Sequence, residues 1–376
     1  MRLAEIVRKG ILCVALVVGG CSFNPPKGTG DTGSGGLTGS GGTVVIVTTG
    51  TGGGAAQGGP GTGGGMQCAA IPKSSSKLPP DILIVQDASG SMNQDSTNAT
   101  CTGGCGMNSK WSLMTAAINQ VTAQTDTTVN WGLKMFADMG TGCGVTNNAA
   151  VNIGTGTSAA ITAALAARTD ANGNVTMGSS TPTRAAENAA VTYLGTVMDM
   201  NPKFIVLATD GQPNCPAMGN NMQADDTPGA VAAVAAAKTA NIPTFVVGIS
   251  AGGAPEMALN MMAVEGGYPQ MGQATQYYPV SSTAEFVAVL QTLVGMATTC
   301  TYSVPEPPSV DTNRGNIAVT GTDTSGNTTG IIMDPTNGWT YGDPMDGSII
   351  LHGTACDQVT AGTITTVTII FNCVVP

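Results

Sequence analysis

Three apolar runs, each ending in turn or polar residues, organise the middle of the chain. They span residues 81–87, 203–210 and 243–250. A short apolar run of this kind predicts a strand that is buried on both faces. Further strands are expected at 129–137, 149–153 and 276–280, and helical spacing occurs at 110–125, 157–168, 183–198, 230–239, 254–264 and 283–296. Strands that alternate with helices predict an α/β fold, a doubly wound, mostly parallel sheet with helices on both faces.

Polar side chains follow the first of these strands at alternate positions. They are Asp87, Ser89 and Ser91. The carboxyl end of a parallel strand is where ligands usually bind, and one carboxylate with two hydroxyls suits a hard divalent cation. The alternative is a helix N-cap, in which Ser89 or Ser91 accepts hydrogen bonds from free backbone amides.

Two further stretches favour the cation site. Residues 178–183, Gly-Ser-Ser-Thr-Pro-Thr, precede an Ala-rich helical segment, and residues 204–211 form a buried strand that ends in Asp210 and a turn glycine. In order and approximate spacing, the three motifs resemble the metal-ion-dependent adhesion site of von Willebrand factor type A (vWA) domains. The resemblance extends from about residue 80 to residue 298 and implies that family's fold.

The resemblance also implies roles for individual residues. Two serines and a threonine would coordinate a cation directly, while two aspartates act directly or through water. The cation expected from such a shell is Mg²⁺, which Mn²⁺ or Ca²⁺ could replace. A carboxylate from a protein or another acidic ligand would complete the shell, so the implied activity is binding and not catalysis. The five residues are Asp87, Ser89, Ser91, Thr181 and Asp210.

Three alternatives remain open at this stage. Thr183 replaces Thr181 if the register of the Thr-Pro-Thr segment differs by two. The domain could instead be a scaffold in an envelope assembly, with the metal only stabilising the loops. The third alternative is a serine hydrolase, because residues 248–252 match Gly-x-Ser-x-Gly around Ser250, with His352 and several aspartates downstream.

Composition limits the class of partner. Of the 376 residues only 10% are charged, the formal net charge is −10, and the 13 lysines and arginines form no basic cluster. A nucleic-acid partner is therefore not expected. Low charge with abundant Gly, Thr, Ala and Asn is typical of an exported bacterial surface protein.

The N-terminal segment predicts export and a lipid anchor. Residues 1–20 carry basic residues and a short apolar stretch, as a signal peptide does. Residues 18–21, Val-Gly-Gly-Cys, resemble a bacterial lipobox, so Cys21 is the expected lipidation site. Ser22 in place of Asp favours the outer membrane of the cell envelope. An ordinary signal peptide with a chance cysteine is the alternative, and the Gly/Thr-rich residues 21–67 would form a flexible tether.

The ordered part is expected to contain two domains. Residues 68–300 hold the vWA-like domain. After a proline-rich linker, residues 301–376 are rich in Thr, Val, Ile and Gly without a helical stripe, which predicts a small all-β module.

Eight cysteines remain after the signal peptide and the lipidated residue, and an even number in an oxidising compartment predicts disulfides. Cys68 and Cys300 bracket the sheet domain, whose termini should lie close together. Cys356 and Cys373 would close the β module. The other four cysteines follow strands on the cation face and allow three pairings, of which Cys101–Cys105 with Cys143–Cys215 is preferred.

Overall fold

The structure is a computed structural model, and the description below covers most of the chain from residue 70 onward. The predicted signal peptide, the lipidation site Cys21, the tether and Cys68 all lie outside the described residues. The described ranges are 70–138, 142–176, 178, 180–217, 222–250, 252–270, 272–298, 300–309, 312–342 and 347–373.

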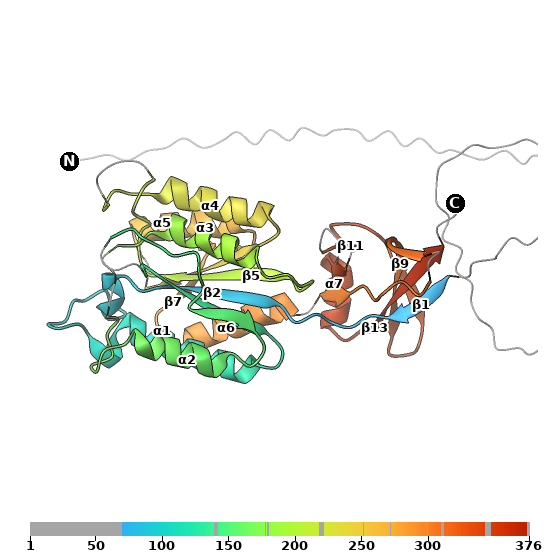
Figure 1. Ribbon diagram of the computed structural model, residues 1–376, viewed down its shortest axis with the longest axis horizontal. Helices are drawn as coiled ribbons and strands as arrows, with labels where there is room; N and C mark the ends of the chain where they lie inside the picture. The colour runs from blue at the N-terminus through green and yellow to red at the C-terminus, as the bar shows by residue number, and fades with distance from the viewer. Residues whose placement is uncertain are drawn as a thin grey trace, which may run out of the picture. The chain divides into compact units, whose positions relative to one another are not determined.

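A six-stranded sheet forms the centre of the first domain (Figure 1). Five of its strands are parallel, and the edge strand β4 is antiparallel to β3. This confirms the predicted doubly wound, mostly parallel α/β fold. In spatial order the strands are β4 (Val151–Gly154), β3 (Asn130–Phe136), β2 (Asp81–Asp87), β5 (Lys203–Thr209), β6 (Thr244–Ile249) and β7 (Tyr278–Val280).

Helices cover both faces of this sheet (Figure 1). Alternate side chains of β2 point to opposite faces, so Ile82 and Ile84 lie in one apolar cluster and Leu83 and Val85 in the other. All seven residues of β2 are buried, which explains the continuous apolar run of residues 82–85. On the first face pack α1 (Lys110–Thr125), α2 (Ser158–Ala167) and α6 (Thr283–Thr298); on the second pack α3 (Thr183–Leu194), α4 (Thr227–Thr239) and α5 (Ala254–Gly266).

The C-terminal region forms two small antiparallel sheets with their own apolar core, which confirms the predicted β module. Two elements correct the prediction: helix α7 (Gly353–Thr360) means that the module is not all-β, and strand β1 (Ile71–Ser74) lies outside the predicted bounds 301–376. The first sheet has the order β1, β13 (Ile364–Cys373), β9 (Thr312–Asp323) and β10 (Thr328–Ile331), and the second has the order β11 (Trp339–Tyr341), β12 (Ser348–Leu351) and β8 (Thr301–Ser303).

Strand β1 is notable because it precedes the vWA-like domain in sequence and yet belongs to the C-terminal sheet. It pairs antiparallel with β13, with Ile71 opposite Phe371. Residues 75–78 then form hydrogen bonds with β8. The sheet domain is therefore inserted between two segments that build the C-terminal module.

Three disulfides are present among the described residues. Cys101–Cys105 and Cys143–Cys215 agree with the preferred pairing. Cys300 pairs with Cys356, so the predicted Cys68–Cys300 and Cys356–Cys373 bridges are wrong. The reason is helix α7: it packs Cys356 against the apolar core that contains Cys300.

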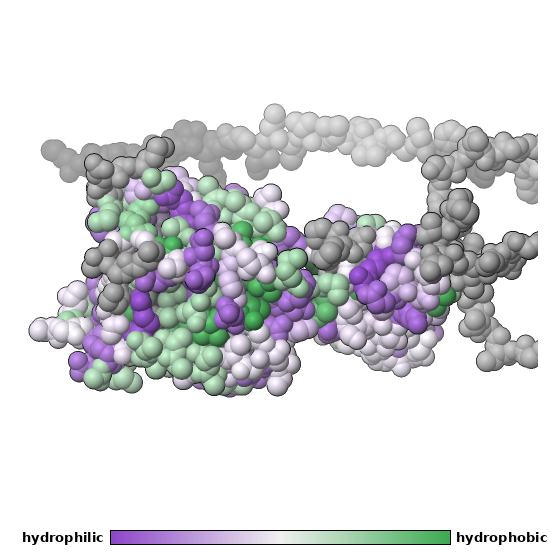
Figure 2. All heavy atoms as spheres, in the orientation of Figure 1, coloured by the Kyte–Doolittle hydropathy of each residue, from purple (hydrophilic) through white to green (hydrophobic). Residues whose placement is uncertain are grey.

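The face of the molecule shown in Figure 2 consists mainly of residues near the middle of the hydropathy scale, with scattered strongly hydrophilic ones. This pattern agrees with the charged fraction of only 10%. Within the described residues, no helix combines the length and the apolar character required to cross a bilayer.

Candidate metal site at the carboxyl end of the sheet

The candidate site lies where β2 and β5 end side by side. These strands are parallel neighbours, with Gln86 opposite Ala208, so the residues that follow them meet at one edge of the sheet. Thr209, the last residue of β5, donates its hydroxyl to Asp87 Oδ2 at 2.5 Å. The register of the two strands thus brings the first and third motifs together.

Asp87 is the most deeply buried carboxylate of the site, with no solvent-exposed surface. Its Oδ1 accepts a hydrogen bond from the Ser89 amide at 2.8 Å. Burial, followed by repulsion from Asp210, raises the pKa of Asp87 to about 7. The repulsion between the two carboxylates favours a positive charge beside them.

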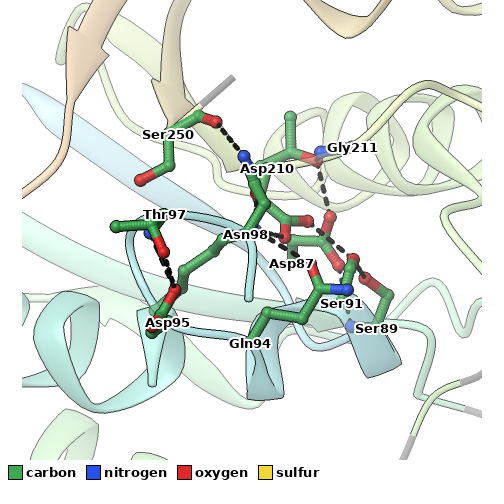
Figure 3. A network of polar contacts seen from close by, with 12 residues as sticks. Asp87, Ser89, Ser91, Gln94, Asp95, Thr97, Asn98, Asp210, Gly211 and Ser250 are labelled. Atoms are coloured by element: carbon green, nitrogen blue, oxygen red, sulfur yellow. Dashed lines mark hydrogen bonds and ion pairs between the residues drawn. The ribbon is translucent and has the colours of Figure 1, made fainter. Parts of the chain in front are cut away.

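Ser89, Ser91 and Asp210 form a connected polar group, and their side chains point toward one another in Figure 3. The two serine hydroxyls are 3.0 Å apart. Ser91 donates to Asp210 Oδ1 at 2.8 Å. A hydroxyl oxygen keeps acceptor lone pairs when it donates, so these groups can also face a cation.

Thr181 joins the group from the loop before α3. A β-carbon added to Gly211 would lie 3.4 Å from Thr181 Oγ1 and 4.0 Å from Ser91 Oγ, so both hydroxyls flank this glycine. The Thr181 amide donates to Asn214 Oδ1 at 2.7 Å, which holds the loop in place. Thr183, the alternative, is fully buried and its hydroxyl donates to the Thr181 carbonyl, which favours Thr181 as the residue that faces the site.

Gly178 explains how the second loop reaches the first. Its φ is +115°, and an added β-carbon would lie 2.2 Å from the Ala88 carbonyl oxygen. Only glycine permits this close approach of the two backbones. All five sequence-predicted residues are therefore brought to one place.

Lys110 is a further residue of the site, and sequence reasoning missed it. It begins α1, its side chain is 1% exposed, and its Nζ lies 2.7 Å from Asp210 Oδ2. The ammonium also donates to Asn98 Oδ1 at 2.5 Å and to Gln94 Oε1 at 3.4 Å. A lysine before an apolar helical stripe usually lies on the surface, so nothing in the local pattern indicated its burial.

The donor chemistry fits a hard divalent cation. The described residues contain no group of three or more His, Cys, Asp or Glu side chains placed to hold a metal. The group here consists instead of two carboxylates and three hydroxyls, all oxygen donors of the type that Mg²⁺, Mn²⁺ and Ca²⁺ accept. The buried, mutually repelling Asp87 and Asp210 supply the negative charge.

A polar pocket of about 600 Å³ opens beside Ser91. An insert between β2 and α1 forms one wall, and the Cys101–Cys105 disulfide closes a short turn in it. Asn174 on the opposite wall donates to the Gly103 carbonyl at 3.1 Å and accepts from the Gly106 amide at 2.8 Å. The lining residues are Gly90, Ser91, Asn93, Gln94, Thr100, Cys101, Gly103, Gly104, Asp170, Asn174, Val175 and Thr176.

The serine hydrolase alternative receives no support from the geometry. Ser250 follows β6 with φ +50°, and its hydroxyl has no hydrogen-bond partner in the described part of the chain. His352 belongs to the C-terminal module, where its Nε2 lies 2.7 Å from Thr340 Oγ1. The hydrogen bond of His352 thus goes to Thr340 and not to Ser250, the serine that it would have to activate.

Comparison with solved structures finds low-identity matches. SpaC, a pilus adhesin from Lactobacillus rhamnosus GG, is 13% identical with a TM-score of 0.43; the match covers 79% of this chain but only 40% of SpaC. The PilB minor pilin from Streptococcus sanguinis is 15% identical with a TM-score of 0.42, covering 59% and 61% of the two chains. Manganese-loaded TRAP protein from Plasmodium vivax is 16% identical with a TM-score of 0.44, covering 67% and 90%.

A search of curated protein sequences finds no match. The profile of the von Willebrand factor type A domain, in contrast, matches residues 81–292, which is more than half of the chain. This range begins with β2 and ends within α6, and so it coincides with the sheet domain described above. The chain therefore belongs to the von Willebrand factor type A domain family.

Proposed function

We propose that the sheet domain binds a protein or another acidic ligand through a divalent cation held by Asp87, Ser89, Ser91, Thr181 and Asp210. The observation that carries this proposal is the convergence of three separate loops on two buried carboxylates. When bound, the cation would offer a coordination position that a ligand carboxylate can fill. Mg²⁺ suits the hydroxyl-rich set, and Mn²⁺ or Ca²⁺ can take its place.

The hydroxyls, Asp87 and the pocket beside Ser91 would each contribute to binding. Ser89, Ser91 and Thr181 offer neutral oxygens, so only the two aspartates offset the charge of a bound divalent cation, and the hydroxyls add no charge that would repel an acidic ligand. Asp87 is fixed by the Ser89 amide and by Thr209. The polar pocket beside Ser91 would contact the rest of the ligand through amide and hydroxyl groups.

The proposal extends to the location of the protein. The disulfides are consistent with export to an oxidising compartment. We propose that acylated Cys21 anchors the chain in the outer membrane and that residues 21–67 act as the tether. Incorporation of labelled palmitate that is lost in Cys21→Ser would support this anchor, and unchanged labelling would contradict it.

A scaffold role is the second candidate, and one observation favours it. The Lys110 ammonium already supplies a positive charge to Asp210, so the loops have a partner for that carboxylate without any metal ion. In that case the domain would hold an envelope assembly together whether or not a cation is present.

Calorimetric titration with Mn²⁺ tests the proposed function most directly. The purified protein should bind one Mn²⁺, and Asp87→Ala should abolish the binding. Asp81→Asn is the matched control, because Asp81 is an equally buried carboxylate at the opposite end of β2 and should leave the affinity unchanged. Absence of Mn²⁺ binding, or identical isotherms for wild type and Asp87→Ala, would overturn the cation site.

Capture from envelope extract then separates the two candidates. Bound partners should be released by EDTA and restored by Mg²⁺ if the cation mediates recognition. An assembly that survives EDTA and also forms with Asp87→Ala would instead identify the scaffold role.

A further inference from the structure

The Lys110 ammonium lies inside the oxygen cluster of the candidate site and not beside it. It contacts three side chains from two segments: Asp210 after β5, and Gln94 and Asn98 in the insert between β2 and α1. Both oxygens of Asp210 are thereby engaged, Oδ1 by Ser91 at 2.8 Å and Oδ2 by Lys110 at 2.7 Å. The carboxylate that the cation would use already has a cationic partner.

Burying the Lys110 ammonium destabilises the fold unless acceptor groups compensate its charge. Burial removes the ammonium from water, and the positive end of the α1 dipole disfavours a cation at the first helical residue. The Asp210 carboxylate and the Asn98 and Gln94 side-chain oxygens offset that cost. The ion pair is consequently part of how the loops fold in the absence of a metal ion.

A second buried lysine shows what a purely structural role looks like. Lys134 in β3 is fully buried, and it donates to the Thr146 carbonyl and, at 3.1 Å, to the Asn148 carbonyl. Its carboxylate partner, Asp138, lies 3.5 Å away and is no part of the candidate site. Lys134 stabilises a loop through hydrogen bonds to its carbonyls, whereas Lys110 forms an ion pair with a carboxylate of the candidate site.

We propose that the Lys110 ammonium is a built-in competitor of the divalent cation for Asp210, and that it sets a low affinity for the ion. This inference rests on the proposed function, since it concerns the same site. Two positive charges that share one buried carboxylate repel each other strongly, because the surrounding protein screens them far less than water does. Removing the ammonium should therefore tighten cation binding, although it removes a favourable ion pair.

The competition has a structural consequence for the insert. Asn98 accepts a hydrogen bond from Lys110 and donates its amide to the Ser250 carbonyl at 3.0 Å, which ties the insert to the end of β6 (Figure 3). Displacing Lys110 from Asp210 would loosen its hold on Asn98. Cation binding should then speed up the hydrogen exchange of the backbone amides of residues 94–100, which lie beside the pocket.

The test is calorimetric titration of Mn²⁺ into wild type, Lys110→Met and Lys110→Gln. Both variants should bind Mn²⁺ at least tenfold more tightly than wild type. Lys110→Gln keeps a hydrogen-bond donor near Asp210, so it serves if Lys110→Met does not fold. Lys134→Met is the matched control: it should lower the melting temperature and leave the Mn²⁺ affinity unchanged.

Each outcome decides between the two proposals. Equal or weaker binding by the folded Lys110 variants overturns the competitor role and leaves the proposed function standing. Binding that is detected only after Lys110 is replaced supports the competitor and overturns cation-dependent recognition by the wild-type protein. No binding by wild type or by either variant overturns both. Hydrogen exchange at residues 94–100 that is unchanged by Mn²⁺ in wild type would also contradict the competition.

Discussion

The two ends of strand β2 make an instructive comparison. Each end carries a carboxylate without exposed surface, Asp81 at the amino end and Asp87 at the carboxyl end, six residues apart. Burial is the largest cause that raises the pKa of both groups, to about 6 for Asp81 and about 7 for Asp87. Yet the two surroundings differ in the kind of partner that they provide.

Amide groups surround the carboxylate at the amino end. Asp81 Oδ1 accepts from Asn130 Nδ2 at 2.9 Å and from Asn201 Nδ2 at 3.1 Å, and Lys203 Nζ lies 3.6 Å from Oδ2. These amide and ammonium nitrogens only donate, so they offer no electron pair to a metal ion, and Asp81 Oδ2 has no hydrogen-bond partner among the described residues. The amino end of β2 is therefore a structural cluster of nitrogen donors around one carboxylate.

Hydroxyls and a second carboxylate surround Asp87 at the carboxyl end. Thr209, Ser89 and Ser91 supply oxygens that can donate and accept. The comparison teaches that a buried acid alone does not indicate a binding site. The chemistry of its partners distinguishes a site from a structural contact.

The largest loss of stability is expected on removal of the Cys143–Cys215 disulfide, which joins two loops at the carboxyl end of the sheet. Cys143 and Cys215 are separated by 72 residues, and loop closure on this scale stabilises a fold by about 4 kcal/mol. Replacing both residues by serine should lower the free energy of unfolding by that amount in urea titrations. The control is the Cys101, Cys105 double serine variant, whose separation of four residues predicts a loss of only about 2 kcal/mol. Equal losses would show that loop length does not decide the stabilisation here.

A second effect concerns the amino end and depends on pH. Glu187 in α3 is fully buried; Oε1 accepts from the Thr244 hydroxyl at the start of β6, and Oε2 has no partner among the described residues. Burial raises the pKa of Glu187 from 4.5 to about 7. Because the folded state binds the proton more tightly, this contribution is complete below pH 4.5 and is lost as the pH rises through about 7.

The shift in the pKa of Glu187 implies that the free energy of unfolding falls by roughly 3 kcal/mol across this pH range. Glu187→Gln mimics the protonated acid and should not lose this stability with pH. Urea unfolding of both proteins in EDTA, between about pH 4 and 8, measures the difference directly and keeps the cation site out of the comparison. Parallel stability curves for wild type and variant would contradict the raised pKa.

The third and smallest effect tests the contact between loops at the carboxyl end. Gly178→Ala adds a β-carbon where the Ala88 carbonyl oxygen leaves no room, whereas at Gly156, φ +73°, no atom lies within 4 Å of the added carbon. Both changes cost strain from positive φ, but only the first also overpacks. In thermal unfolding, the free energy of unfolding of Gly178→Ala should be about 2 kcal/mol lower than that of Gly156→Ala. Mn²⁺ affinity should fall only in Gly178→Ala, and similar affinity in both would mean that the loop contact is not required.

Much of the sheet domain could be predicted from sequence because its signals are local. The buried strands end in polar residues at Asp87 and Asp210, and parallel strands bring such ends to one edge. Lys110 could not be predicted in the same way. Its burial depends on Asn98 and Gln94 folding over it, and no periodic pattern encodes that contact.

The C-terminal module was harder to predict because its elements depend on distant partners. Strand β1 has four residues and no alternation, and it forms through pairing with β13 at the other end of the chain. The pairing of Cys300 depends on α7, a short helix in a region whose composition indicates strands. Local composition carries no information about either contact.

The position of β1 has a mechanical consequence. From Ile71 the backbone passes along the edge of the C-terminal sheet and continues through residues 75–80 directly into β2, which ends at Asp87. Tension between the N-terminal segment and a molecule held at the carboxyl end of β2 would therefore run along one continuous covalent segment. Among the described residues, the C-terminal module contacts this segment through the pairing of β1 with β13 and the hydrogen bonds of residues 75–78, and it would share the load through these contacts.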